Sequence, residues 1–259
     1  MNRICIYCAG ELRADGNGFK CVNCGSFLTE DELRPKVRQA PGSYAVETPV
    51  TPKSDCGVDV FASNVNGVLE IAWSDNQYIH SGSGFLISSD GYAVTNTHVV
   101  THEDGRSCDR VDVRVCGETV AADVVKLGDD HHGEGQGVDL AVIKLSRVPA
   151  GAKVVQFENF DNVRIGESVF VIGNSLGHGT CITAGIVSDR LRNVNGNMLM
   201  MTDCAINGGN SGGPIFNEKG RVIAAVVSGI TSAEGMNFAI PSSTIIRFLQ
   251  NVPGGLRAP

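Results

Sequence analysis

A series of short apolar segments extends from about Val58 to Leu249 in this sequence. Each segment is rich in β-branched residues and is bounded by residues that favour turns. Short runs of this kind are typical of strands, whereas an amphipathic helix would need a longer run with a period of about 3.6 residues. The clearest examples are SGFLIS, YAVTN, RVDVRV, LAVIKL, SVFVIG, GIVS, MLMMT and RVIAAVVSGI. We therefore predict an all-β barrel or sandwich for this part of the chain.

The end of the apolar region has the pattern of a helix instead. In PSSTIIRFLQN, Pro241 and the two serines after it form an entry signal, because hydroxyl side chains cap the first turn of a helix. Ile245, Ile246 and Leu249 then follow at a spacing that places them on one face. We predict one amphipathic C-terminal helix over 241–250.

Two shorter regions precede the apolar segments. Residues 31–57 contain four of the nine prolines and few large apolar side chains, which is typical of an extended linker. Residues 1–30 contain four of the nine cysteines. We therefore expect three parts: a small cysteine-rich module over 1–30, a Pro-rich linker over 31–57 and a large β domain over 58–252.

The cysteine-rich module has the spacing of a metal site. Cys5-x2-Cys8 and Cys21-x2-Cys24 are separated by twelve residues, so two tight turns can present four sulfurs to one ion. Four thiolates form the closed tetrahedral shell that suits structural Zn²⁺, and the metal would stabilise a module with too little core of its own. Two disulfides, or an accidental pairing, are the alternatives. The pattern resembles the zinc ribbon found at the N-termini of many bacterial proteins, and we expect it to contact a protein partner or the adjoining domain.

The other five cysteines lack any motif spacing. An odd total of nine argues against a fully disulfide-paired secreted framework. In a reducing compartment we expect these five to be buried thiols that act as small apolar groups. They are Cys56, Cys108, Cys116, Cys181 and Cys204.

Charge and hydropathy exclude two classes of partner. The 28 acidic residues outnumber the 21 basic residues, for a formal net charge of −7, whereas binding to phosphate groups requires a basic face. No apolar run approaches the roughly 18 residues of a membrane span. The N-terminal stretch MNRICIYCAGELR has too short an apolar run for a secretory signal peptide. We therefore expect a cytoplasmic protein that binds neither nucleic acid nor a membrane.

Residues 207–214 read NGGNSGGP, with four glycines around one serine. A serine becomes a nucleophile only when a base takes its proton, and acyl transfer also needs backbone N–H groups aimed at the developing oxyanion. Glycines before the serine let the chain turn such N–H groups inward. A flexible linker is the alternative, but a strand-like pattern follows directly after Pro214. We therefore predict a nucleophile at Ser211, with Gly209 and Ser211 as the oxyanion-hole donors.

A nucleophilic serine requires a base and a group that orients this base. Of the six histidines, His98 lies at the end of the strand-like run GYAVTNTHVV, whereas His131, His132 and His178 lie in turn- or loop-like sequence. Asp139 opens the apolar run DLAVIKL, where its carboxylate could accept the Nδ1 proton of an imidazole. The order histidine, aspartate, serine differs from that of α/β-hydrolases and of subtilisins.

Several longer segments resemble, in the same order, those of trypsin-like serine endopeptidases of the chymotrypsin fold, closest to the HtrA/Deg branch. They are GSGFLISSDGYAVTNTHVV, VDLAVIKL, IGESVFVIGNSLG, TAGIVS, TDCAINGGNSGGPIFNEKGRVIAAV and MNFAIPSS, and they span about residues 65–250. The resemblance implies two six-stranded β-barrels, over about 58–150 and 151–240. It also implies hydrolysis of protein substrates through an acyl-enzyme, with His98 as general base, Asp139 as its orienting group and Ser211 as nucleophile.

The chain also departs from this family. HtrA proteins usually carry PDZ domains after the protease and are usually exported, whereas only about nine residues follow the predicted helix and no export signal is evident. We therefore do not expect activation or assembly through PDZ domains, and the oligomeric state stays open. We expect the zinc ribbon to take over targeting or regulation.

The resemblance also points to a substrate preference. In this fold the base of the specificity pocket lies six residues before the nucleophile, which here is Ala205. No acidic residue is present there to bind a basic side chain. Ala205 and Ile206, with Val227, Ser228 and Gly229 on the pocket wall, imply a small or medium apolar residue before the cleaved bond.

Two other functions remain open. One is a catalytically silent protease fold that recruits a protein partner through the ribbon and holds peptide without cutting it; the complete set of three catalytic positions argues against it. The other is a nucleic-acid-associated factor, which the acidity and the lack of a basic, aromatic-rich strip disfavour.

Overall fold

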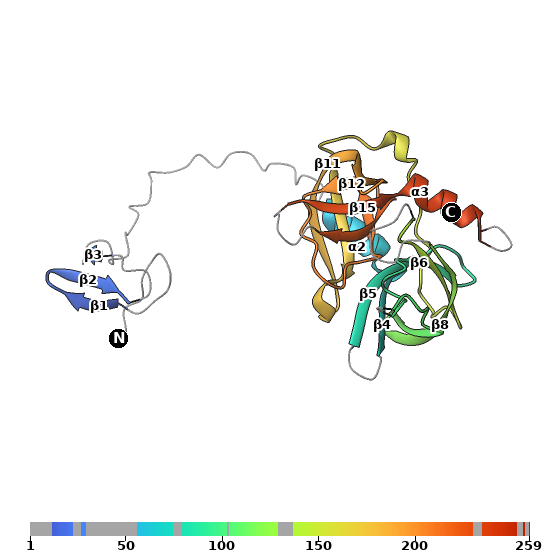
Figure 1. Cartoon of the computed structure of the whole chain (residues 1–259), viewed down its shortest axis with the longest axis horizontal. Coiled ribbons are helices and arrows are strands. Elements are labelled where there is room, and N and C mark those ends of the chain that lie inside the picture. The colour runs from blue at the N-terminus through green and yellow to red at the C-terminus, as the bar shows by residue number, and fades with distance from the viewer. Residues whose placement is uncertain are drawn as a thin grey trace, which may run out of the picture. The chain divides into compact units, whose positions relative to one another are not determined.

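The computed structural model of the chain describes residues 12–22, 27–29, 56–74, 79–102, 104–128, 137–229, 235–252, 256 and 259. The chain divides into two compact units, Met1–Pro52 and Lys53–Pro259 (Figure 1). Cys5, Cys8 and Cys24, three of the four predicted zinc ligands, lie outside the described residues, as does almost all of the predicted linker.

The described part of the first unit is a small antiparallel sheet with the strand order β1-β2-β3. Its strands are β1 (Leu12–Asp15), β2 (Gly18–Cys21) and β3 (Phe27–Thr29). The apolar residues buried in this part are Leu12, Cys21 and Leu28, with Phe19 packed against them. A core of this size rarely stabilises a fold without a further link such as a metal ion.

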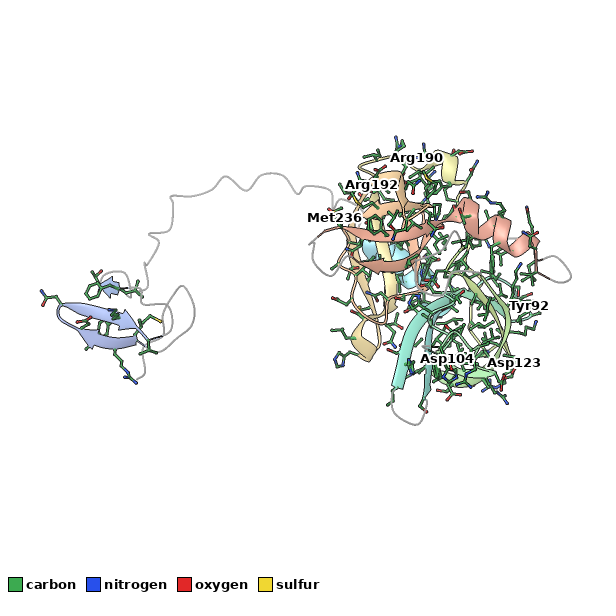
Figure 2. The ribbon with its side chains drawn as sticks, viewed as in Figure 1. Tyr92, Asp104, Asp123, Arg190, Arg192 and Met236 are labelled. Atoms are coloured by element: carbon green, nitrogen blue, oxygen red, sulfur yellow. The ribbon has the colours of Figure 1, made fainter. Side chains whose placement is uncertain are left out.

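The second unit contains two closed six-stranded barrels, as predicted (Figure 1). The first barrel has the order β4-β5-β6-β9-β8-β7 and the second the order β10-β11-β12-β15-β14-β13. The strands of the first barrel are β4 (Val68–Ser74), β5 (Ile79–Leu86), β6 (Tyr92–Thr95), β7 (Arg110–Val115), β8 (Glu118–Leu127) and β9 (Ala141–Leu145). Those of the second are β10 (Ser168–Asn174), β11 (Thr180–Val194), β12 (Asn197–Thr202), β13 (Pro214–Asn217), β14 (Val222–Gly229) and β15 (Asn237–Pro241). Charged side chains such as Asp123 and Arg192 are exposed on the outside of the barrels (Figure 2).

The helices match the sequence analysis only in part. The C-terminal helix α3 (Ser242–Gln250) confirms the prediction for 241–250. Helix α2 (Cys56–Asn64) was not predicted, and it begins two residues inside the region assigned to the linker. Its formation depends on tertiary packing, because Val60 is buried in the cluster between the barrels. None of the described helices has the length and apolar character needed to cross a bilayer.

Short 3₁₀ turns complete the described elements of the second unit. They are η1 (Val65–Gly67), η2 (Phe160–Asn162) and η3 (Ser175–Gly177). The last of these turns lies between β10 and β11, and it takes part in the site described below.

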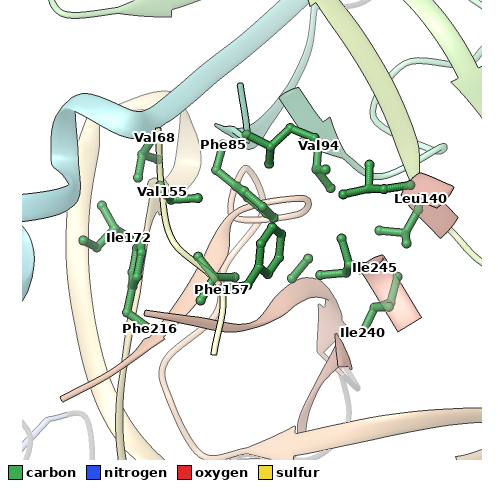
Figure 3. Close-up of a cluster of buried hydrophobic side chains, with 14 of the residues drawn as sticks. Val68, Phe85, Val94, Leu140, Val155, Phe157, Ile172, Phe216, Ile240 and Ile245 are labelled. Atoms are coloured by element: carbon green, nitrogen blue, oxygen red, sulfur yellow. The ribbon is translucent and has the colours of Figure 1, made fainter. Parts of the chain in front are cut away.

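Three apolar clusters build the second unit. One fills the first barrel and one fills the second. The third lies between the barrels and includes Ile245 of α3 (Figure 3). In this third cluster Phe85 of the first barrel meets Phe157 edge to face, with ring centroids 6.0 Å apart. The clusters hold the two barrels together, so that residues from both can form one site.

The five scattered cysteines are buried only in part, contrary to the prediction. Cys108 and Cys204 are buried, whereas Cys56, Cys116 and Cys181 are partly exposed. Cys116 has φ +51° because it lies in the turn between β7 and β8, where the chain reverses at the surface. Burial raises the pKa of the Cys204 thiol, so this residue behaves as the small apolar group expected.

The buried Glu158 is expected to make the stability of the second unit depend on pH. Its carboxylate accepts hydrogen bonds from Asn162 Nδ2 (2.9 Å), Asn217 Nδ2 (3.2 Å) and the Asn159 backbone N–H (3.1 Å). These bonds, that of Asn162 above all, hold the pKa of Glu158 below its ordinary value. The stabilisation is therefore present above the unfolded pKa of about 4.3 and is lost as the pH falls through the folded pKa.

Glu158→Gln should remove this dependence. The free energy of unfolding of Glu158→Gln and of the wild type should be measured in urea between pH 3 and 7. The two values should differ most above about pH 5, and the difference should become smaller below about pH 4.3. Glu118→Gln, a change at a partly exposed carboxylate, is the control. A difference that stays constant over the whole pH range would contradict the assignment.

Candidate active site

Strand pairing in the first barrel brings His98 and Asp139 together. β6 pairs with β9, and His98 follows β6 while Asp139 precedes β9. Two side chains of the intervening turn fix this arrangement: Asn96 Nδ2 donates to the Asp139 carbonyl (2.7 Å) and Thr97 Oγ1 donates to the Leu140 carbonyl (2.8 Å). Both of these side chains are buried, so their hydrogen bonds are protected from water.

Both oxygens of the Asp139 carboxylate hold His98. Oδ2 lies 2.6 Å from His98 Nδ1, and Oδ1 accepts the His98 backbone N–H at 3.1 Å. An ionised carboxylate can only accept, so the ring proton must be on Nδ1. The Nε2 atom of the neutral imidazole then has a free lone pair, as a general base requires.

Ser211 lies where the two barrels meet. Its carbonyl accepts the backbone N–H of Ser83 of the first barrel (2.8 Å), and the next residue, Gly212, donates its N–H to Val226 of the second barrel (2.9 Å). Gly212 has φ +80°, and a Cβ atom there would lie 2.4 Å from Thr95 Oγ1. A glycine is therefore required directly after the serine, because the chain passes too close to the first barrel for a side chain.

The Ser211 hydroxyl is not bonded to His98 in the structure. Among the described residues, its partner is the carbonyl of Val227, to which Oγ donates at 3.1 Å. The hydroxyl must leave the Val227 carbonyl before it can donate to His98. Catalytic hydrogen bonds are often long or misaligned before substrate binds, so this arrangement is compatible with a relay.

Two backbone N–H groups beside Ser211 are free to bind an oxyanion. Within the described part of the chain, neither the Gly209 N–H nor the Ser211 N–H donates a hydrogen bond. The Gly208 carbonyl accepts from the Leu176 N–H at 2.7 Å. Because a trans peptide directs its C=O and its N–H to opposite sides, this bond turns the Gly209 N–H away from Leu176.

Gly209→Ala is expected to damage this arrangement. Gly209 has φ +91°, and a Cβ atom there would lie 2.1 Å from the Asn174 carbonyl, so the chain must move. Loss of one oxyanion-hole donor typically lowers kcat by about 10²–10³-fold. Steady-state kinetics on a fluorogenic peptide would measure the change. Gly151→Ala, which has a similar positive φ but no close contacts, is the matched control, and an equal loss in both variants would contradict the explanation.

A groove of about 910 Å³ opens beside His98 and Val227. It extends from the first barrel across the turn between β11 and β12 to helix α3. Apolar side chains form much of its wall, and they include Val138, Met198, Leu199, Phe238, Ile240 and Phe248. Arg247 of α3 also lines the groove, far along the chain from the predicted site residues.

Of the predicted specificity-pocket residues whose side chains the structure describes, only Val227 lines this groove. Ala205 is exposed, and Ile206 packs against the interior of the second barrel. Ser228 and Gly229 lie at the end of β14. Val227 of β14 therefore lines the groove, while Ala205 and Ile206 do not.

The described residues contain no group of three or more histidine, cysteine or acidic side chains that could hold a metal ion. Of the predicted zinc ligands only Cys21 falls in this part, where it is buried at the end of β2. His131 and His132 lie outside the described residues.

Sequence reasoning missed the residues that hold the serine turn. Ser83 Oγ donates to the Gly209 carbonyl (2.7 Å) and accepts the Asn174 N–H (2.9 Å). The small residues of SGSGF around Ser83 were a possible signal, because they mark a close approach of two chains. Leu176 acts through its backbone, so its side chain carried no signal at all.

Known proteins with similar sequences indicate the family of this chain. A family model described as trypsin-like peptidase domain matches residues 82–224. A curated protein of Brucella suis biovar 1 (strain 1330), named "Probable periplasmic serine endoprotease DegP-like", is 38% identical over 172 residues, which are 64% of this chain and 31% of that protein. The protein of the same name from Chlamydia trachomatis serovar D is 39% identical over 171 residues, 62% of this chain and 31% of the relative. The chain thus spans about a third of the length of these relatives.

Solved structures show the same fold. "HtrA-type protease AlgW with tripeptide" superposes with a TM-score of 0.65 at 27% identity, covering 77% of this chain and 64% of that chain. The serine endoprotease from Yersinia pestis superposes with a TM-score of 0.60 at 26% identity, covering 73% of this chain and 64% of that chain. The family match and the double barrel agree, and this chain belongs to the family of trypsin-like peptidase domains, with HtrA/DegP-like serine endoproteases among its homologues.

Proposed function

We propose that this chain is a serine endopeptidase that cleaves protein substrates. The observation that carries the proposal is the His98–Asp139 pair, in which both carboxylate oxygens fix the imidazole. Ser211 lies at the junction of the barrels, beside two N–H groups that no described residue uses. These are the base, the orienting group, the nucleophile and the oxyanion donors that acyl transfer requires.

In the proposed mechanism, substrate binding turns the Ser211 hydroxyl from the Val227 carbonyl toward His98. His98 Nε2 takes the hydroxyl proton while Oγ attacks the peptide carbonyl carbon, and the Gly209 and Ser211 N–H groups bind the resulting oxyanion. His98 then protonates the leaving amine. A water molecule, activated by the same nitrogen, releases the acyl group from Ser211.

A fluorophosphonate probe tests the proposal, because it reacts with activated serines. We expect one adduct per chain, located on Ser211 by mass spectrometry, together with cleavage of an unfolded protein such as casein. Heat-denatured protein is the control and should not be labelled. Absence of both labelling and cleavage would refute the proposal.

We also propose a preference for a small or medium apolar residue before the cleaved bond. The proposal is supported by the apolar side chains that form much of the groove wall beside Val227. Cleavage-site profiling of a peptide library would test it. Strong selection of arginine or lysine at this position would contradict it.

A second candidate function is binding of peptide without cleavage. The bond from Ser211 Oγ to the Val227 carbonyl favours it, because a hydroxyl held there has no base. This candidate predicts saturable peptide binding without fluorophosphonate labelling. The same probe experiment therefore separates the two functions.

We propose that the N-terminal module is a zinc ribbon that recruits a protein partner or regulates the protease. Cys21 and the other predicted ligands, Cys5, Cys8 and Cys24, would hold Zn²⁺ as a structural ion, with no part in catalysis. Metal analysis should find about one zinc per chain, lost in Cys24→Ser and kept in the control Cys116→Ser. Deletion of residues 1–30 should change substrate choice or partner binding, and unchanged behaviour in both assays would contradict the regulatory role.

A further inference from the structure

Two side chains of the first barrel hold both ends of one hairpin of the second barrel. This hairpin, residues 174–180, joins β10 to β11, and Asn174 is paired with Thr180 at its base. Ser83 Oγ accepts the Asn174 N–H at 2.9 Å. Glu70 Oε1 accepts both the Thr180 N–H at 3.0 Å and the Thr180 hydroxyl at 2.8 Å. Since Glu70 and Ser83 are opposite each other on β4 and β5, their side chains leave the same face of the sheet.

The tip of the 174–180 hairpin sets the direction of an oxyanion donor. The Leu176 N–H bonds to the Gly208 carbonyl, whose peptide unit also carries the Gly209 N–H. Rotation of that peptide unit would break the bond and turn the Gly209 N–H out of the site. The hairpin is also in close contact with Gly209 through the Asn174 carbonyl. Any shift of the hairpin therefore moves the donor.

The hairpin tip needs support from outside. Leu176 has φ +56°, and Gly177 and Gly179 have φ +71° and +98°. A left-handed angle at a residue with a side chain is unfavourable and persists only where surrounding contacts impose it. The bonds from Glu70 and Ser83 at the base are such contacts, and Glu70 supplies the only ionisable acceptor among the bonds described for the hairpin.

We propose that Glu70 is a positioning residue for the oxyanion hole, acting from the opposite barrel through Thr180 and the 174–180 hairpin. The proposal rests on the endopeptidase function proposed above. The side-chain bonds described for Glu70 are to Thr180, and none of them involves His98, Asp139 or Ser211. Its effect must therefore appear in stabilisation of the transition state rather than in binding of the substrate. Ser83 is less suitable for a test, because it also bonds to the Gly209 carbonyl and, through its N–H, to Ser211.

The test compares Glu70→Ala with Glu70→Gln. Glu70→Ala should lower kcat by about 10- to 100-fold, less than complete loss of an oxyanion donor because the Ser83 contact remains. KM should change by less than about twofold. The affinity of a peptide aldehyde, which forms a tetrahedral adduct, should fall in proportion to kcat/KM. Glu70→Gln keeps an oxygen that can accept both bonds from Thr180, so it should restore most of kcat.

Two further comparisons distinguish positioning from loss of fold. Glu118→Ala removes a partly exposed carboxylate of the same barrel, whose described partner is Arg147, and should have the kcat of the wild type. The NMR signal of the His98 Nδ1 proton, which reports the bond to Asp139, should be unchanged in Glu70→Ala. The proposal is overturned if kcat is undiminished in Glu70→Ala or if Glu70→Gln does not restore it. It is also overturned if the fraction of unfolded enzyme in Glu70→Ala accounts for the whole loss of kcat. Failure of the endopeptidase function itself would be seen separately, as absence of fluorophosphonate labelling at Ser211 in the wild type.

Discussion

Replacing Ser211 with alanine is expected to lower kcat for peptide hydrolysis by about 10⁶-fold. The substitution removes the nucleophilic oxygen, and neither the Val227 carbonyl nor the His98 ring can replace it. The Ser211 N–H remains, so one oxyanion donor and the shape of the turn are kept. Among the described residues, Oγ makes one hydrogen bond, to Val227, so the loss of stability should be only about 1 kcal/mol.

Single-turnover kinetics and peptide-binding titration on the same variant would check this expectation. Ser211→Ala should bind a substrate peptide with an affinity close to that of the wild type and should not be labelled by the fluorophosphonate. Ser243→Ala, at an exposed serine of α3, is the matched control and should retain full activity. Residual hydrolysis within about 100-fold of the wild type would show that another group is the nucleophile.

Asp139→Asn is expected to lower kcat by about 10⁴-fold with little change in the fold. The His98 backbone N–H requires an acceptor, so the amide oxygen must take the place of Oδ1. The amide NH₂ group then faces His98 Nδ1, which must become an acceptor and lose its proton. The remaining ring proton moves to Nε2, where it blocks transfer from Ser211. The side chain keeps its size, so the effect should appear in kcat rather than in stability.

Kinetics and thermal unfolding should be measured together on Asp139→Asn. The control is Asp123→Asn, which neutralises an exposed carboxylate of the same barrel and should leave both quantities unchanged (Figure 2). Circular dichroism should show the same strand content in both variants. An activity loss below tenfold in Asp139→Asn would mean that this carboxylate does not control the tautomer of His98.

The strands and the C-terminal helix could be predicted because their signals are local. Alternating or continuous β-branched runs identify strands such as β7 and β9, and the spacing of Ile245 and Leu249 identifies α3. Helix α2 gave no such signal, because its formation depends on burial of Val60 between the barrels. Strand β8 was equally hard to recognise, since Asp123 and Lys126 interrupt its apolar pattern.

The residues of the candidate site were likewise predictable from the sequence only in part. His98, Asp139 and Ser211 carry distinctive chemistry within recognisable segments, so the sequence alone indicated them. Ala205 and Ile206 were placed in a substrate pocket by resemblance, and neither lines the groove that the structure contains beside His98. Pocket walls are formed by side chains from distant segments, and local sequence patterns do not predict which of these side chains lie together.

Local patterns along the chain were enough to indicate the strand-rich class of this protein, its C-terminal helix and the three residue types available for acyl transfer, because each of these depends on neighbouring residues. The groups that hold the site in shape are known from the folded structure alone: the two oxygens of Asp139 on His98, the contact of Ser211 with Val227, and the bonds from Glu70 and Ser83 to one hairpin. These contacts join residues far apart in the chain, and several use backbone atoms that every residue possesses. Closure of two barrels around a shared core brings them within hydrogen-bonding distance.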